Sequence, residues 1–128
     1  MKQLRQFITE KLKINSNSKV NEYSYHPKDK EELKELVKKL IKERGEDADL
    51  NDIDTSEITD MSKLFYLSKF NGDISKWDVS NVTTMYKMFT RSKFNGDISN
   101  WNVSNVERNF AMFKFSPLQK NPPKWYHE

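Results

Sequence analysis

The chain has 128 residues, of which 35% are hydrophobic, 32% are charged and none is cysteine. This length fits one domain, and the lack of cysteine excludes disulfides and thiolate chemistry. The net charge of +3 comes from basic and acidic residues interleaved through most of the chain, which predicts a mild field and no specific nucleic-acid partner. No stretch reaches the ~18 apolar residues of a transmembrane segment. The N-terminus lacks the apolar run of a secretory signal, so we expect the protein to be cytoplasmic at synthesis.

The first segment, residues 1–14, is predicted to be an amphipathic leader helix. Leu4, Phe7 and Ile8 fall on one face at helical spacing. Residues 15–21, with the sequence NSNSKVN, are typical of a linker. A helix separated in this way is a candidate for contacting a partner, through Phe7 and Ile8 in particular.

The next segment, residues 28–45, is predicted to be a helix with defined ends. Asp29 and Glu32 form a capping-box pattern at its start, and Gly45 is a suitable stop. We expect the helix to cover the first repeat, so that residues 15–47 comprise the linker and an N-terminal capping helix. The apolar residues recur at the spacing of one helix face: Leu33, Leu36, Val37, Leu40 and Ile41.

The remaining chain is dominated by an internal repeat. The segment FNGDIS at 70–75 recurs at 94–99, and Trp77 recurs as Trp101. A fainter copy lies one period earlier. Three units therefore occupy residues 48–119. A period of about 24 residues is typical of a solenoid, in which each unit packs on its neighbours.

Each unit is predicted to contain a turn, a short strand and a short helix. The NGD turn uses Gly72 or Gly96, and the following DISxWDVSNV has the β-branched and aromatic residues of a strand. The segment that starts at Thr83, TTMYKMF, has helical spacing with threonine as its N-cap. The predicted fold class is therefore an α/β repeat. It is a short solenoid of three strand-helix units, each of about 24 residues, with an N-terminal helical cap.

The last segment, residues 120–128, is predicted to be a C-terminal cap. Pro122 and Pro123 stand where a fourth strand would begin, and proline cannot donate to a ladder. Trp125 follows one period after Trp101 and is placed to cover the last exposed unit. A cap of this kind protects an open edge from pairing with other chains.

No arrangement of catalytic or metal-ligating residues stands out. His26 and His127 lie at opposite ends of the chain, outside any ligand-spaced motif, so we expect no enzymatic activity, no cofactor and no metal. Aspartates recur with the period of the repeat in two rows, one of Asp49, Asp73 and Asp97, and one of Asp54 and Asp78 with Asn102 in the third place. Such a row could bind calcium, but hydrogen bonding to a turn backbone is the favoured interpretation.

Four residues of the repeats are candidates for contacting a partner. Trp77 and Trp101 form either buried rungs of the core or a recognition ladder for a glycan or peptide, and the core is favoured in so aliphatic-poor a chain. Tyr86 and Lys87 lie between the methionines of the predicted helix, which we expect to be buried. These two side chains are therefore expected to be exposed.

The repeat resembles a known family. The motif F-N-G-D-I-S-x-W-D-V-S-N-V-T-x-M-x-x-M-F at residues 70–89 is similar to the repeat of BspA-like bacterial surface proteins, which are leucine-rich-repeat relatives also found in phages and mobile elements of gut bacteria. The resemblance covers about residues 50–115. It implies a non-enzymatic binding or adhesion module, with a protein or glycan as partner. Self-association stays open.

The leader supports an alternative function. The sequence MKQLRQFITE is similar to the targeting leaders of internal head proteins in some large tailed phages, through Met1, Lys2, Phe7, Ile8 and Glu10. This similarity implies a structural or packaged virion component that the leader helix directs into the particle. An ordinary amphipathic helix produces the same pattern, so both functions remain hypotheses.

Overall fold

The structure is a computed structural model that describes residues 23–127. The predicted capping helix is present as α2, Lys30–Arg44. The carboxylate of Asp29 accepts from the N–H of Glu32 at 3.0 Å, and the Glu32 carboxylate accepts from the N–H of Lys28 at 2.9 Å. Gly45, with a φ of 103°, ends the helix. The leader and the linker lie outside the described residues, and their secondary structure remains a prediction.

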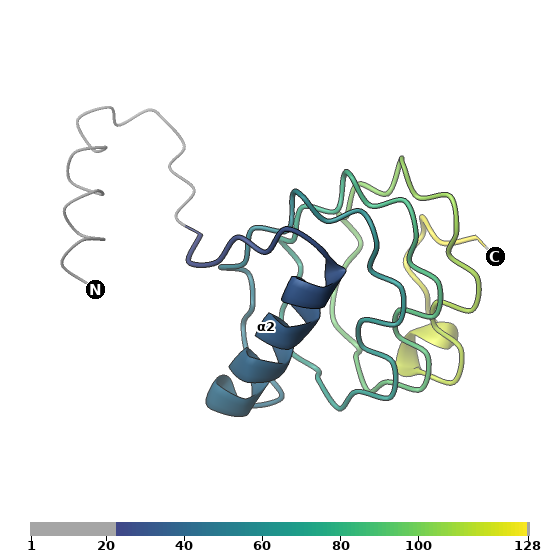
Figure 1. Ribbon diagram of the computed structural model, residues 1–128. Helices are drawn as coiled ribbons and strands as arrows, with labels where there is room; N and C mark the ends of the chain where they lie inside the picture. The colour runs from purple at the N-terminus through teal and green to yellow at the C-terminus, as the bar shows by residue number, and fades with distance from the viewer. Residues whose placement is uncertain (1–22, 128) are drawn as a thin grey trace, which may run out of the picture.

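Helix α2 covers the N-terminal end of the stacked loops (Figure 1). Leu33 and Leu40 are fully buried on this side, as the apolar spacing predicts. The last turn is fixed by Arg44, whose guanidinium donates to both carboxylate oxygens of Asp52 at 3.1 and 3.0 Å and to the carbonyl of Asp49 at 2.9 Å. The guanidinium holds the pKa of Asp52 below its usual value. None of the helices in the described part of the chain is long and apolar enough to cross a membrane.

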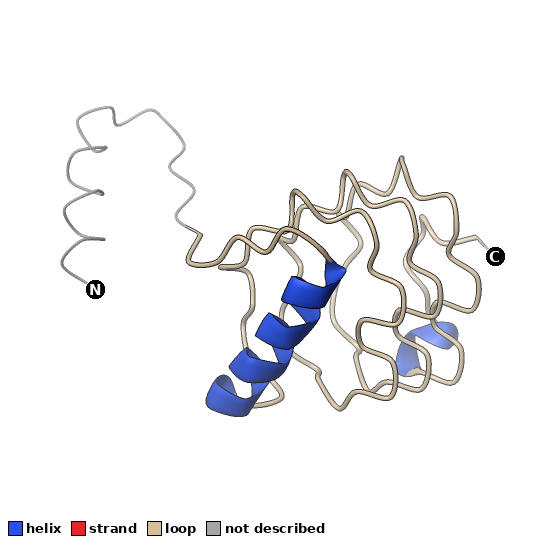
Figure 2. Ribbon diagram, viewed as in Figure 1, coloured by secondary structure: helices blue, strands red, loops and turns tan. Residues whose placement is uncertain are grey.

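The strand and the helix predicted for each unit are not formed. Among the described residues, the regular elements are α2 and a short 3₁₀ helix, η1, at Pro117–Gln119 (Figure 2). The rest is a compact coil in which loops one period apart lie in parallel register. The register is given by isolated bridges from Asp49 to Asp73, from Asp60 to Thr84, and from Thr84 to Arg108.

Residues 83–89, predicted to be a helix, form a run of tight turns instead. The N–H of Met88 donates to the carbonyl of Met85 at 3.1 Å, but the N–H of Lys87 donates across to Phe110 of the next unit at 3.1 Å. Lys87 also has a φ of 53°, which a right-handed helix does not allow. Positive φ recurs at equivalent positions of the three units, at Lys63, Leu67, Lys87, Arg91, Ala111 and Phe115.

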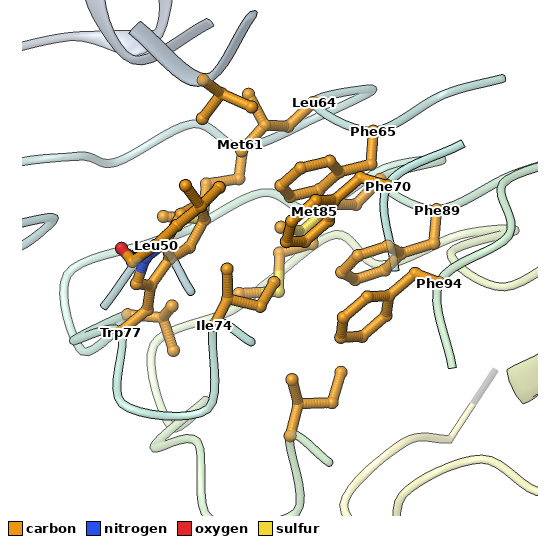
Figure 3. Close-up of a cluster of buried hydrophobic side chains, with 14 of the residues drawn as sticks. Leu50, Met61, Leu64, Phe65, Phe70, Ile74, Trp77, Met85, Phe89 and Phe94 are labelled. Atoms are coloured by element: carbon orange, nitrogen blue, oxygen red, sulfur yellow. Dashed lines mark hydrogen bonds between the residues drawn. The ribbon is translucent and has the colours of Figure 1, made fainter. Parts of the chain in front are cut away.

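Phenylalanines fill the core in rows (Figure 3). Phe65 stacks on Phe89 with ring centroids 5.5 Å apart, and Phe89 stacks on Phe113 at 5.7 Å. A second row pairs Phe70 with Phe94 at 6.0 Å. All five rings are at most 2% exposed. The described repeats lack regular strands and α-helices, so burial of these large apolar side chains is a main source of their stability.

The tryptophans extend this core. Trp77 and Trp101 are only 3% and 4% exposed, which agrees with the core interpretation rather than with a recognition ladder. Each donates its indole N–H to the backbone carbonyl of a residue in the preceding unit, at 2.9 and 3.1 Å. Trp125 repeats this bond at 2.8 Å and stacks on Trp101 at 6.3 Å. The C-terminal segment thus covers the last unit, and Phe113 contacts Tyr126 edge-on at 4.9 Å.

Candidate functional site

Basic and acidic residues occupy different parts of each unit. The segments 61–72, 85–96 and 109–127 contain no aspartate or glutamate, yet lysine or arginine occurs more than once in each. Because the units pack in register, these segments lie next to one another and bring their cations together. The overall net charge conceals this separation. The signal was present in the sequence as an acid-free stretch with the period of the repeat.

The outward side chains of these segments form one surface, which we call the basic–aromatic face. It carries large apolar side chains in contact with solvent: Tyr66 is 39% exposed, Leu67 61%, Phe110 59% and Phe115 57%. Exposed apolar groups that recur on one surface mark an interaction site more often than scattered single ones do. The face consists of Lys63, Tyr66, Leu67, Tyr86, Lys87, Arg91, Phe110, Lys114 and Phe115.

Tyr86 is the centre of one cluster on this face. Its ring stacks on Phe110 with centroids 6.0 Å apart and planes 15° apart. The ammonium groups of Lys63 and Lys87 lie 5.9 and 5.3 Å from the Tyr86 centroid. Parallel stacking covers the facing side of each ring. The two ammonium groups make this part of the surface electropositive.

Phe115 is the centre of a second cluster. The guanidinium of Arg91 lies 4.6 Å from its ring centroid, and the ammonium of Lys114 lies 5.4 Å away. Leu67 holds the equivalent position of the first unit, two periods earlier. These cation–π contacts link neighbouring units and keep the exposed ring in place. An anionic partner would therefore meet a preformed arrangement of cations.

A cleft of about 380 Å³ lies between α2 and the first unit, at one end of the face. Lys34 and Lys38 of α2 and Lys63 of the face surround it, and Ile41 and Leu64 belong to its apolar lining. Its volume is within the range of ligand pockets. The lining contains no acidic residue, and it is completed by Val37, Phe65, Tyr66 and Ser68.

The aspartates of the repeats have a structural role. The Asp73 carboxylate accepts from the N–H of Ser75 at 2.9 Å and from its hydroxyl at 2.7 Å. The side-chain oxygen of Asn102 accepts from the N–H of Ser104 at 3.1 Å and from its hydroxyl at 2.8 Å. A neutral amide is therefore sufficient to cap this turn. The interpretation of these rows as turn caps is confirmed. In the part of the chain that the structure describes, no three His, Cys, Asp or Glu residues are grouped to hold a metal ion.

The candidate contact residues named from the sequence fall into three groups. Tyr86 and Lys87 are partly exposed at the centre of the basic–aromatic face. Trp77 and Trp101 lie in the core. Phe7 and Ile8 lie outside the described residues, and their role remains a prediction. The sequence interpretation missed the exposed aromatic and basic residues of the last unit, Phe110, Lys114 and Phe115.

The comparison with protein families shows the family to which the chain belongs. Residues 31–127 match the family described as a Mycoplasma protein of unknown function, DUF285, and the chain belongs to that family. The match runs from α2 through the C-terminal segment and so includes the basic–aromatic face. Comparison with characterised proteins and with solved structures gave no significant match.

Proposed function

We propose that this chain is a non-enzymatic binding module, a short BspA-like solenoid that contacts a protein or glycan partner through the basic–aromatic face. The solenoid interpretation is supported by the bridges and hydrogen bonds that join residues one period apart. In such an array each unit contacts only its neighbours, and the outward positions combine into one extended surface. The resemblance of the repeat to BspA-like proteins and the extended outward surface both support a binding function.

The observation that carries the proposal is the exposure of Phe110 and Phe115 on a surface rich in cations. Each ring buries less than half of its surface in its own chain. A partner that covered these rings would gain hydrophobic free energy without disturbing the core. The neighbouring cleft contains lysines and apolar side chains but no carboxylate or imidazole with which a lysine could form an acid–base pair. The surface therefore suits recognition better than catalysis.

The experiment is an affinity capture from lysate of the source cells, with identification of the captured proteins by mass spectrometry. The test variant carries Lys87→Glu and Arg91→Glu on the face. The matched control carries Lys28→Glu and Lys76→Glu, which make the same charge change at exposed positions outside it. Thermal melting followed by circular dichroism checks that both variants fold.

We expect the wild type and the control to capture the same partner and the face variant to lose it. Equal capture by all three proteins would refute the assignment of the face as the binding surface. A further variant that lacks residues 1–14 separates the repeats from the leader. Capture that depends only on the leader would favour the packaged virion component instead.

A further inference from the structure

We infer that the partner is an acidic protein segment with an apolar side chain, which seats that side chain in the cleft beside α2 and lays its carboxylates along the basic–aromatic face. The inference rests on the proposed function and names the ligand class of the same surface. It is built from the charge around the cleft, the composition of its lining, the orientation of the exposed rings and the spacing of the units.

The positive charge of the lysines around the cleft favours an anionic ligand. Lys34 and Lys38 are one helical turn apart on α2, and Lys63 lies across from them. None of the three forms an ion pair with any residue that the structure describes, although Lys30 and Lys39 of the same helix do. Like charges at this spacing repel, and Glu31 and Glu35, one turn before the two lysines on α2, form no ion pair with them. Carboxylates of a partner would remove that repulsion.

The lining of the cleft selects an apolar side chain. Ile41 and Leu64 contribute aliphatic surface, and Val37 and Phe65 beneath them belong to the core. The polar groups of the lining are the hydroxyls of Tyr66 and Ser68 and the lysine ammonium groups, so the aliphatic part of the cleft offers no hydrogen-bond partner to a sugar or a nucleobase placed against it. A leucine-sized or phenylalanine-sized side chain would fit within such a site and displace water from its apolar part. The cleft thus favours a protein segment over other polyanions.

The exposed rings point to the same conclusion. Single-stranded nucleic acids and many sugars bind by stacking on the open faces of aromatic rings. Tyr86 and Phe110 stack on each other instead, and Arg91 and Lys114 lie over the ring of Phe115. Faces of these rings are therefore occupied within the chain, and the cations beside them attract carboxylates. The face is therefore better suited to acidic side chains than to bases.

The spacing of the units matches an extended acidic segment. Equivalent rings of successive units lie 5.5 to 6.3 Å apart. In an extended chain, every second side chain points the same way at a spacing of roughly 7 Å. Carboxylates on alternate residues can therefore reach Lys63 and then Lys87, which hold equivalent positions of successive units. The last unit has Ala111 at that position and offers the cation of Lys114 three residues later. A segment that starts in the cleft would reach all three units.

The test uses fluorescence anisotropy at low salt with the full-length protein and four probes. The first probe is the labelled peptide EELEEFEEL, and the second is EESEESEES, which has the same charge and no apolar side chain. A short thymidine oligonucleotide and an oligogalacturonate of similar charge represent the other polyanions. We expect EELEEFEEL to bind at least roughly tenfold more tightly than EESEESEES, because it buries apolar side chains. We also expect it to bind more tightly than either non-peptide probe.

Two variants locate the binding. Lys34→Glu with Lys38→Glu should weaken both peptides, whereas Ile41→Ser should abolish the preference for EELEEFEEL and leave EESEESEES binding unchanged. Should Ile41→Ser lose its cooperative melting transition, Tyr66→Ser at the exposed rim of the cleft serves the same purpose. The Lys87→Glu and Arg91→Glu variant reports on the face as a whole.

Each outcome decides one of the two proposals. If the peptide preference is absent or survives Ile41→Ser, the inference is wrong, while the proposed function stands provided that the face variant still loses binding. If the oligonucleotide or the oligogalacturonate binds as tightly as EELEEFEEL, the partner belongs to another class and the inference is wrong. If no probe binds at low salt, the inference is also wrong. Probe binding that the face variant leaves unchanged contradicts the proposed function itself.

Discussion

Removing the indole of Trp77 tests whether the stacked rows are the source of stability. Trp77 is 3% exposed, and its ring lies 6.0 Å from that of Phe65. Its N–H donates to the carbonyl of Leu50 at 2.9 Å and so joins two neighbouring units. The carbonyl of Leu50 also accepts from the N–H of Ile53 at 3.3 Å, so it keeps one partner when the indole is lost.

The expected cost of Trp77→Ala is therefore dominated by lost burial. Replacing a buried tryptophan by alanine costs about 3–5 kcal/mol, and the shared hydrogen bond accounts for about 0.5–1.5 kcal/mol of this. For a chain of 128 residues each kcal/mol lowers the Tm by about 3–6 °C, so Trp77→Ala should lower the Tm by roughly 9 °C or more. Trp77→Phe retains most of the apolar surface and should cost much less.

The assay is urea unfolding followed by circular dichroism, with Trp125→Ala as the matched control. Trp125 makes the equivalent hydrogen bond at 2.8 Å, but it lies at the end of the array and is only partly buried. We expect Trp125→Ala to destabilise the protein by about half as much as Trp77→Ala or less, because less apolar surface is lost. A loss below about 1.5 kcal/mol for Trp77→Ala, or equal losses for the two variants, would refute the reasoning.

Three further predictions concern the turns and α2. A Cβ at Gly72 would lie 1.9 Å from the carbonyl oxygen of Ala48, so Gly72→Ala should cost about 1–3 kcal/mol or more in urea unfolding; an unchanged midpoint would contradict this close approach. Arg44 lowers the pKa of Asp52, so the unfolded chain takes up the proton first on acidification. The resulting stabilisation is present above about pH 4 and is lost as the pH falls through the lower folded pKa, and Tm measured across the acidic range should fall more steeply for the wild type than for Asp52→Asn. Asp29→Ala should cost about 1 kcal/mol by loss of the helix cap, whereas Asp29→Asn should retain most of the stability in the same urea assay.

Helix α2 was predictable because its determinants are local. The cap at Asp29, the apolar spacing and the stop at Gly45 all lie within the segment itself. The same reasoning failed for residues 83–89. Met85, Met88 and Phe89 are buried at helical spacing, but a run of tight turns buries the same positions. The backbone forms turns because its N–H groups donate to carbonyl groups of the next unit. These acceptors lie one period away, so a local sequence pattern does not reveal them.

The candidate site shows the same division. Tyr86 and Lys87 could be named from the sequence because they stand between residues with a strong apolar pattern. Arg91, Phe110 and Phe115 could not, because an exposed ring or cation has no local signature in one unit. The sequence by itself determined the period of the repeat, the capping helix and the segments that lack acidic residues. Only the tertiary structure decided which side chains meet, because stacking in register places residues one period apart in contact and turns scattered cations and rings into one surface.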